Sequence, residues 1–134
     1  MSSDRHLRIR RGHASETAED YVEAIAWITA ERGCCRLTEL AKHFGVSHVT
    51  ASKILARLKR HGLVQTIPYA PVQLTESGLR LAKQSHERHQ TVVNFLIALG
   101  VKPATAELDA EGIEHHVSQE TLKRMQDFTL RRGR

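Results

Sequence analysis

The sequence contains neither a long apolar run nor a pattern of paired cysteines. No stretch approaches the roughly 20 consecutive apolar residues that a membrane-spanning helix needs, and charges occupy the N-terminal region where a signal peptide has its apolar core. Cys34 and Cys35 are adjacent, so they cannot easily bridge to each other, and there is no CxxC motif. We expect a cytoplasmic protein with no membrane partner, in which both cysteines are thiols packed at a helix end.

Motifs that mark common enzyme classes are also missing. There is no glycine-rich phosphate loop and no nucleophile motif, and the pair His115 and His116 lacks the H-E-x-x-H order of zinc proteases. We therefore expect no enzymatic activity, and a hydrolase with paired metals is disfavoured.

The composition is ordinary for a globular domain except for a basic surplus. Of the 134 residues, 40% are hydrophobic and 26% are charged, and 20 Lys and Arg outnumber 15 Asp and Glu, for a net charge of +5. The length suits one domain or two small lobes. The surplus suits an anionic partner such as nucleic acid, although many basic proteins bind none.

The first 14 residues carry four arginines and almost nothing to bury, which predicts a mobile basic tail that is also suited to lying along DNA. Ser15 or Thr17 is the expected N-cap of the following helix, and Gly33 is its expected end. The buried stripe of this helix follows from apolar residues at i, i+3, i+4 and i+7. These residues are Tyr21, Ala24, Ile25 and Ile28.

Residues 37–60 follow the pattern of a helix-turn-helix, with an ordinary helical hairpin as the alternative. Thr38 is the expected N-cap of a short first helix, Gly45 supplies the turn, and Ser47 is the expected N-cap of the second helix. The buried face of the second helix includes Val49 or Ala51. Its outward face combines small polar groups near the start with cations further along, as a helix in the major groove requires. The expected DNA-binding residues are Ser47, His48, Val49, Thr50, Ser52, Lys53 and Arg57.

After the second helix the pattern changes to two short strands, 63–67 and 72–75, which predict a β-hairpin wing. The tip has two prolines and no cation, so DNA contact there is expected from Tyr69 alone. Thr75 is the expected N-cap of a long helix that ends at Gly100. Its later part, 92–99, is apolar nearly all round, which predicts a homodimer interface. Ser118 is the expected N-cap of the last helix.

The stretch 111–116 contains an acidic cluster with an imidazole. In an α-helix, Glu111, Glu114 and His115 stand at i, i+3 and i+4, so two carboxylates and one imidazole share a face. This arrangement is costly unless a cation lies among the carboxylates, although a solvated acidic face is the plain alternative. Gly112 inside the helix costs roughly 1 kcal/mol against Ala, which predicts a close approach there.

Together these motifs resemble a known family. Asp-Tyr-Val-Glu at 20–23, Arg-His-Gln at 88–90 and Glu-Gly-Ile-Glu-His-His at 111–116 frame a winged helix-turn-helix. The combination resembles the manganese-transport-regulator branch of the diphtheria-toxin-repressor (DtxR/MntR) family over about residues 20–128. The resemblance implies a mainly α fold with a small β-hairpin wing. A winged helix-turn-helix domain (15–76) would be followed by a helical metal-binding and dimerisation domain (77–134).

The resemblance also implies a binuclear Mn(II) site in each subunit. By motif its ligands are Asp20, Glu23, His89, Glu111, Glu114 and His115, while His86 and His116 have no assigned role. A set of carboxylates and imidazoles without sulfur suits a hard divalent ion, and the iron-sensing relatives have sulfur ligands where this chain has Asp20 and Glu111.

The expected function is therefore a homodimeric repressor that responds to Mn(II), binds a palindromic operator and represses metal-uptake genes. Without metal the clustered acids repel one another, and metal would couple the winged heads to the dimer core. The alternatives are a winged-helix regulator that responds to Fe or Zn, or one that responds to an organic ligand.

Overall fold

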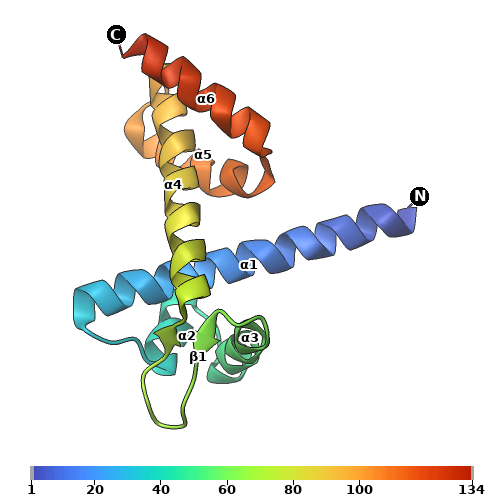
Figure 1. The fold of residues 1–134 in the computed structure, drawn as a ribbon, viewed down its shortest axis with the longest axis vertical. Helices are drawn as coiled ribbons and strands as arrows, with labels where there is room; N and C mark the ends of the chain where they lie inside the picture. The colour runs from blue at the N-terminus through green and yellow to red at the C-terminus, as the bar shows by residue number, and fades with distance from the viewer. Residues whose placement is uncertain (1, 134) are drawn as a thin grey trace. The chain divides into compact units, whose positions relative to one another are not determined.

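The computed structural model describes residues 2–133, with side chains described from Glu16 onward. Its backbone divides into two compact units (Figure 1). The first contains residues 13–83, and the second contains 84–134 together with the residues up to Gly12. The elements are α1 (Ser2–Arg32), α2 (Leu37–Phe44), α3 (His48–Arg60), β1 (Val64–Gln65), β2 (Gln73–Leu74), α4 (Glu76–Ala98), α5 (Pro103–Ile113), the 3₁₀ turn η1 (Glu114–His116) and α6 (Gln119–Arg132). The predicted fold class, mainly α with a small β-hairpin, is confirmed.

The core of the first unit is built from the apolar stripe of α1. All four predicted stripe residues are buried, and the Tyr21 ring stacks on Phe44 of α2 with ring centres 4.1 Å apart. The stripe packs against residues from α2, α3 and the hairpin: Leu40, Leu55, Leu58, Val64 and Val72. The periodicity of α1 is therefore what gathers the helix-turn-helix into one core.

The start of α1 differs from the expected capping position. The helix begins at Ser2, not at Ser15 or Thr17, so its backbone includes the segment predicted to be a tail. Whether this segment is mobile in solution stays a prediction. The predicted end is confirmed, because the helix stops at Arg32 and Gly33 has a φ of 86°.

Of the caps predicted for the helix-turn-helix, one is wrong and one is confirmed. The N-cap of α2 is Arg36, without a side-chain hydrogen bond, because the backbone N–H groups of Glu39 and Leu40 already donate to the Arg36 carbonyl. Thr38 thus lies inside the first turn. Ser47 caps α3, with its Oγ accepting a hydrogen bond from Thr50 N at 3.1 Å.

The hairpin is shorter than predicted, but it is present. The strands β1 and β2 pair antiparallel, with Val64 opposite Leu74, and an isolated bridge joins Cys35 to Val72. Cys35 forms no disulfide, is fully buried at this junction and belongs to the core, so the predicted packing is confirmed for this cysteine. At the tip Tyr69 is fully exposed and has a φ of 65°.

The beginning of α4 approaches the hairpin very closely at Gly78. A Cβ added at this glycine would lie 2.1 Å from the Leu63 carbonyl oxygen. The same oxygen accepts a hydrogen bond from Thr75 N, and Thr75 Oγ1 caps the helix by accepting from Gly78 N at 3.1 Å. The cap at Thr75 is confirmed. The close approach predicted at Gly112 is wrong, because no described atom lies within 4 Å of a Cβ there.

In the second unit α5 and α6 lie beside the later half of α4 (Figure 1). Small residues on α5 allow this packing, since Ala106 and Ala110 are fully buried against the α4 valines Val92 and Val93. Leu122 of α6 completes the core. Ser118 caps α6 as predicted, by accepting from Thr121 N at 3.1 Å. Within residues 2–133 no helix is both long and apolar enough to cross a membrane.

Candidate metal centre and nucleic-acid interface

The second unit contains a cluster of imidazoles and carboxylates centred on Glu114. Its Oε2 pairs with Nδ1 of His89 on α4, and its Oε1 lies 3.3 Å from Nε2 of His115. The Glu114 side chain is only 3% exposed and that of His115 only 2%. A buried carboxylate between two imidazoles is the arrangement that a divalent cation or protons must neutralise.

A further carboxylate reaches His89 from α5. Glu107 Oε2 lies 2.7 Å from His89 Nε2, so both ring nitrogens of this histidine face carboxylates. No motif in the sequence points to Glu107. The available signal was its position, one turn before Glu111 on the same helix, but a helical pattern alone does not tell which acid meets His89.

The surroundings raise the pKa of both His89 and Glu114. For Glu114 the cause is burial, opposed by His89 and His115 and assisted by the charge of Glu111. For His89 burial acts to lower the pKa, but the hydrogen bonds and charges of Glu107 and Glu114 outweigh it. The metal-free cluster therefore holds protons more tightly than isolated side chains do, which is the electrostatic demand that a cation would meet.

The predicted register of the acidic motif is only partly correct. The α-helix ends at Ile113, and Glu114, His115 and His116 form a 3₁₀ turn. Glu114 nevertheless keeps a right-handed helical backbone, with a φ of -60° and a ψ of -29°, and its N–H donates to the Ala110 carbonyl, so Glu111 and Glu114 stay one turn apart. Glu111 is exposed whereas Glu114 is buried. Within this 3₁₀ turn the side chains of Glu114 and His115 are both buried.

Of the six predicted ligands, the structure brings three together: His89, Glu114 and His115. Glu111 lies near enough to influence the pKa of Glu114. Asp20 and Glu23 belong to the first unit, where both are partly buried on α1. Glu23 Oε1 is buried and has no hydrogen-bond partner among the described residues, which is costly for a carboxylate. That Asp20 and Glu23 complete the ligand set stays a prediction.

The donors present fit a hard divalent ion. They are carboxylate oxygens and imidazole nitrogens, whereas the two cysteines lie in the first unit, just after the end of α1. Within the second unit, burial raises the energetic cost of a charge on Glu114, a cost that a bound cation would lower.

The outward face of α3 in the first unit is open along its length. All predicted DNA-binding residues are exposed except Arg57, which is half-buried. Ala51 is fully buried and Val49 is 63% exposed, which resolves the choice between them and leaves Val49 on the outward face. These residues offer hydroxyl, imidazole and ammonium groups from the first turns of one helix, as recognition of base edges in a major groove requires.

Polar contacts join the wing to α3 and to the start of α2. Lys59 Nζ donates to the Thr66 carbonyl at 3.5 Å, and Arg36 Nη1 donates to the Tyr69 carbonyl at 3.4 Å. A hollow of about 430 Å³ lies between α3 and the hairpin tip, lined by Ser52, Lys59 and Tyr69 among others. The wing tip is therefore held beside the helix, with the Tyr69 ring fully exposed.

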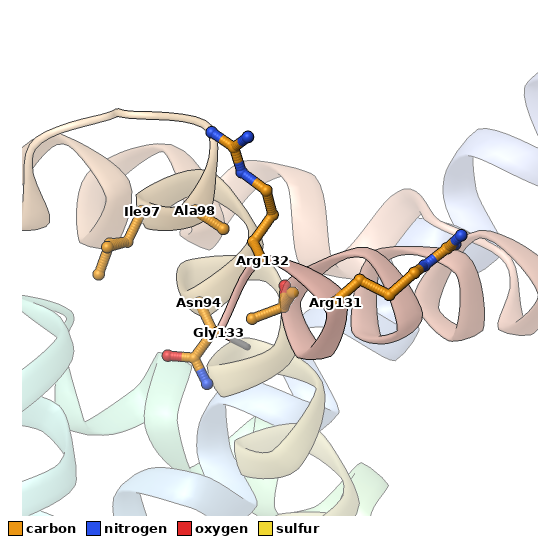
Figure 2. A pocket seen from close by; sticks show the side chains of 7 residues that line it. Asn94, Ile97, Ala98, Arg131, Arg132 and Gly133 are labelled. Atoms are coloured by element: carbon orange, nitrogen blue, oxygen red, sulfur yellow. The ribbon is translucent and has the colours of Figure 1, made fainter.

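Apolar side chains remain uncovered in the second unit. Ile97 and Leu99 at the end of α4 are 41% and 54% exposed, and Leu130 of α6 is 61% exposed. A hollow of about 660 Å³ lies between the end of α4 and the end of α6. Figure 2 shows Ile97, Ala98 and Arg132 among the side chains that line it. An uncovered apolar region of this kind suits a subunit interface.

Models of known protein families match both units of the chain. The model described as iron dependent repressor, N-terminal DNA binding domain, matches residues 13–72. The model described as iron dependent repressor, metal binding and dimerisation domain, matches residues 75–131. The chain is 47% identical to the transcriptional regulator MntR of Escherichia coli O6:H1 over 94% of its length, covering 81% of that protein. It is 48% identical to MntR of Salmonella typhimurium, covering 80% of that protein.

Solved structures of transcriptional regulators are also similar to the chain. A manganese-dependent transcriptional repressor in complex with manganese matches 84% of the chain with a TM-score of 0.72 and 33% identity. The manganese regulator SloR matches 83% with a TM-score of 0.70 and 26% identity. The chain spans about half of each of these two, 52%.

The relatives are transcriptional regulators, which are not enzymes, and the expected absence of enzymatic activity agrees with this. Both the DNA-binding head and the metal-binding and dimerisation unit of the family are present in the chain. On this identity and coverage, the protein belongs to the DtxR/MntR family of iron-dependent repressors, in its branch of MntR transcriptional regulators.

Proposed function

We propose that the protein is a manganese-responsive repressor that binds a palindromic operator as a homodimer in the cytoplasm and represses genes for metal uptake. The observation that carries the proposal is the buried Glu114 carboxylate between His89 and His115, in the unit that matches a metal-binding and dimerisation domain. The relatives named for manganese support the choice of ion.

We further propose that Asp20, Glu23, His89, Glu111, Glu114 and His115 hold Mn(II) as a binuclear site in each subunit. The bound ions would supply positive charge that neutralises the clustered carboxylates. Each residue has a role in this: the carboxylates offer hard oxygen donors, and His89 and His115 offer neutral nitrogen donors once deprotonated. Loss of the repulsion between acids favours an ordered protein in which both heads of the dimer engage DNA.

The proposal is tested by DNA binding with and without metal. A duplex selected from a random pool in the presence of Mn(II) is titrated with protein in Mn(II) or in chelator, with fluorescence anisotropy as the readout. We expect Mn(II) to tighten binding at least about tenfold, or about 1.4 kcal/mol, within the usual range of coupling between sites. Equal affinity in Mn(II) and chelator would contradict the proposal and favour a regulator that senses an organic ligand.

The choice of manganese is tested by changing the donors. In the double variant Asp20→Met, Glu111→Cys, two charged oxygen donors are replaced by sulfur, which favours Fe(II), Co(II) or Zn(II) over Mn(II). We expect this variant to lose the response of DNA binding to Mn(II) and to keep a response to Fe(II) or Co(II). An unchanged response to Mn(II) would show that these two positions do not set the selectivity.

A further inference from the structure

His89 stands between two carboxylates that differ sharply in their surroundings. Glu114, on the Nδ1 side, has a side chain only 3% exposed. Glu107, on the Nε2 side, has a side chain 56% exposed, and its carboxylate reaches back from α5 to α4. The imidazole itself is only 13% exposed, so its orientation is set by these two partners and by packing.

The two ring nitrogens of His89 therefore face different partners. Nδ1 faces Glu114, whose other oxygen faces His115, so the predicted ligands gather on the Nδ1 side of the ring. Nε2 lies 2.7 Å from Glu107 Oε2, a length typical of a charge-assisted hydrogen bond. A histidine that binds a metal through one nitrogen usually donates the N–H of the other to a carboxylate, which fixes the ring and makes it a better donor.

We propose that Glu107 is a positioning residue for His89. Its carboxylate accepts a hydrogen bond from Nε2–H and thereby holds Nδ1 toward the metal-binding cluster without itself binding the metal. The inference rests on the proposed function, because it assumes that His89 is a metal ligand. It adds a seventh residue, one that belongs to none of the motifs of the family resemblance.

The chain offers a matched control for Glu107. Asp109 is an exposed carboxylate two residues along the same helix, so removing either side chain takes one negative charge from the same part of α5. A general loss of attraction for cations would affect both variants alike, whereas loss of ring positioning affects only the change at Glu107. Glu107→Gln keeps an oxygen acceptor and serves as the conservative variant.

The first measurement is metal affinity. Calorimetric titration with Cd(II) alone, and separately with Mn(II) alone, would compare the parent, Glu107→Ala, Glu107→Gln and Asp109→Ala proteins. We expect Glu107→Ala to weaken binding about 10- to 100-fold, as the loss of a carboxylate behind a metal-binding histidine typically does. Glu107→Gln should fall between it and the parent, and Asp109→Ala should stay close to the parent. Because Glu107 is exposed, circular dichroism should show all variants folded.

The second measurement identifies the nitrogen that binds the metal. In protein labelled with ¹⁵N-histidine and loaded with ¹¹³Cd(II), coupling to cadmium should appear on His89 Nδ1. In the parent, His89 Nε2 should carry a proton that is protected from exchange with solvent, and in Glu107→Ala this protection should be lost. Coupling through Nε2, or unchanged affinity of Glu107→Ala, would overturn the inference while leaving the proposed function standing. A parent that takes up neither metal would overturn both.

Discussion

Replacing Gly78 by alanine should damage the junction between the wing and α4. The added methyl carbon would lie 2.1 Å from the carbonyl oxygen of Leu63 and 3.1 Å from a methyl group of Leu74. The oxygen is part of the backbone and is fixed by a hydrogen bond from Thr75 N, so it cannot move aside without loss of that bond. The substitution therefore sets a steric clash against the better helix propensity of alanine.

The clash should prevail. Overpacking typically costs about 1–3 kcal/mol, and a contact with backbone belongs at the upper end of that range. Displacing the Thr75 hydrogen bond costs about 1 kcal/mol more, while alanine gains at most about 1 kcal/mol in a helix interior. We expect the free energy of unfolding of Gly78→Ala to fall by about 2–3 kcal/mol.

The matched control is Gly112→Ala. This glycine also lies in a helix, but no described atom is within 4 Å of its added Cβ. Without a clash only the propensity term remains, so Gly112→Ala should gain about 0.5–1 kcal/mol. Urea unfolding followed by circular dichroism, at one fixed protein concentration because a dimer's stability depends on it, measures both. Equal stability of the two variants would refute the reasoning from close approach.

Three further outcomes follow from the structure. Lys53→Ala should reduce the ratio of the affinity for specific DNA to that for random DNA, because Lys53 is exposed near the start of α3. Arg57→Ala should instead weaken the binding of all DNA sequences alike and flatten its salt dependence. Competition titrations at several salt concentrations distinguish the two effects. Burial, with the nearby charges of an acid and the neighbouring thiol, raises the pKa of Cys35 to about 11, so roughly one Cys35 thiol in a thousand is ionised at about pH 8. Iodoacetamide should therefore label Cys34 first in the folded protein and both cysteines in urea, as mass spectrometry would show. Because the pKa of His89 is raised, its proton stabilises the metal-free fold at low pH, and this contribution is lost as the pH rises through that pKa. The affinity for Mn(II), measured by calorimetry, should therefore increase from about pH 6 to about pH 8. An affinity that does not change with pH would contradict a role for this imidazole.

The N-caps of α3, α4 and α6 could be predicted from the sequence, because an N-cap depends mainly on residues next to it in the chain. Ser47, Thr75 and Ser118 each accept a hydrogen bond from the backbone three residues on, which the order of residues largely decides by itself. Arg36 shows the limit of this reasoning. Its carbonyl begins α2 although Thr38 is the better capping side chain, because the chain leaves the Cys35 bridge to the wing just before it.

The sequence also determined the family motif, and with it the ligands proposed for the metal. Periodicity placed the α1 stripe in the core, and the apolar end of α4 was recognised as too large a surface for one chain to cover. These conclusions need only the spacing of residues along single helices.

Only the tertiary structure decided which side chains meet across elements. His89 and Glu107 are 18 residues apart, and the packing of small α5 residues on α4 brings them within 2.7 Å. Glu114 is buried whereas Glu111, one turn earlier, is exposed, although the two look equivalent in a helical pattern. The close approach lies at Gly78 and not at Gly112, because a glycine's neighbours are set by how the hairpin crosses the helix. Contacts of this kind depend on the relative placement of elements within each unit, which no local rule encodes.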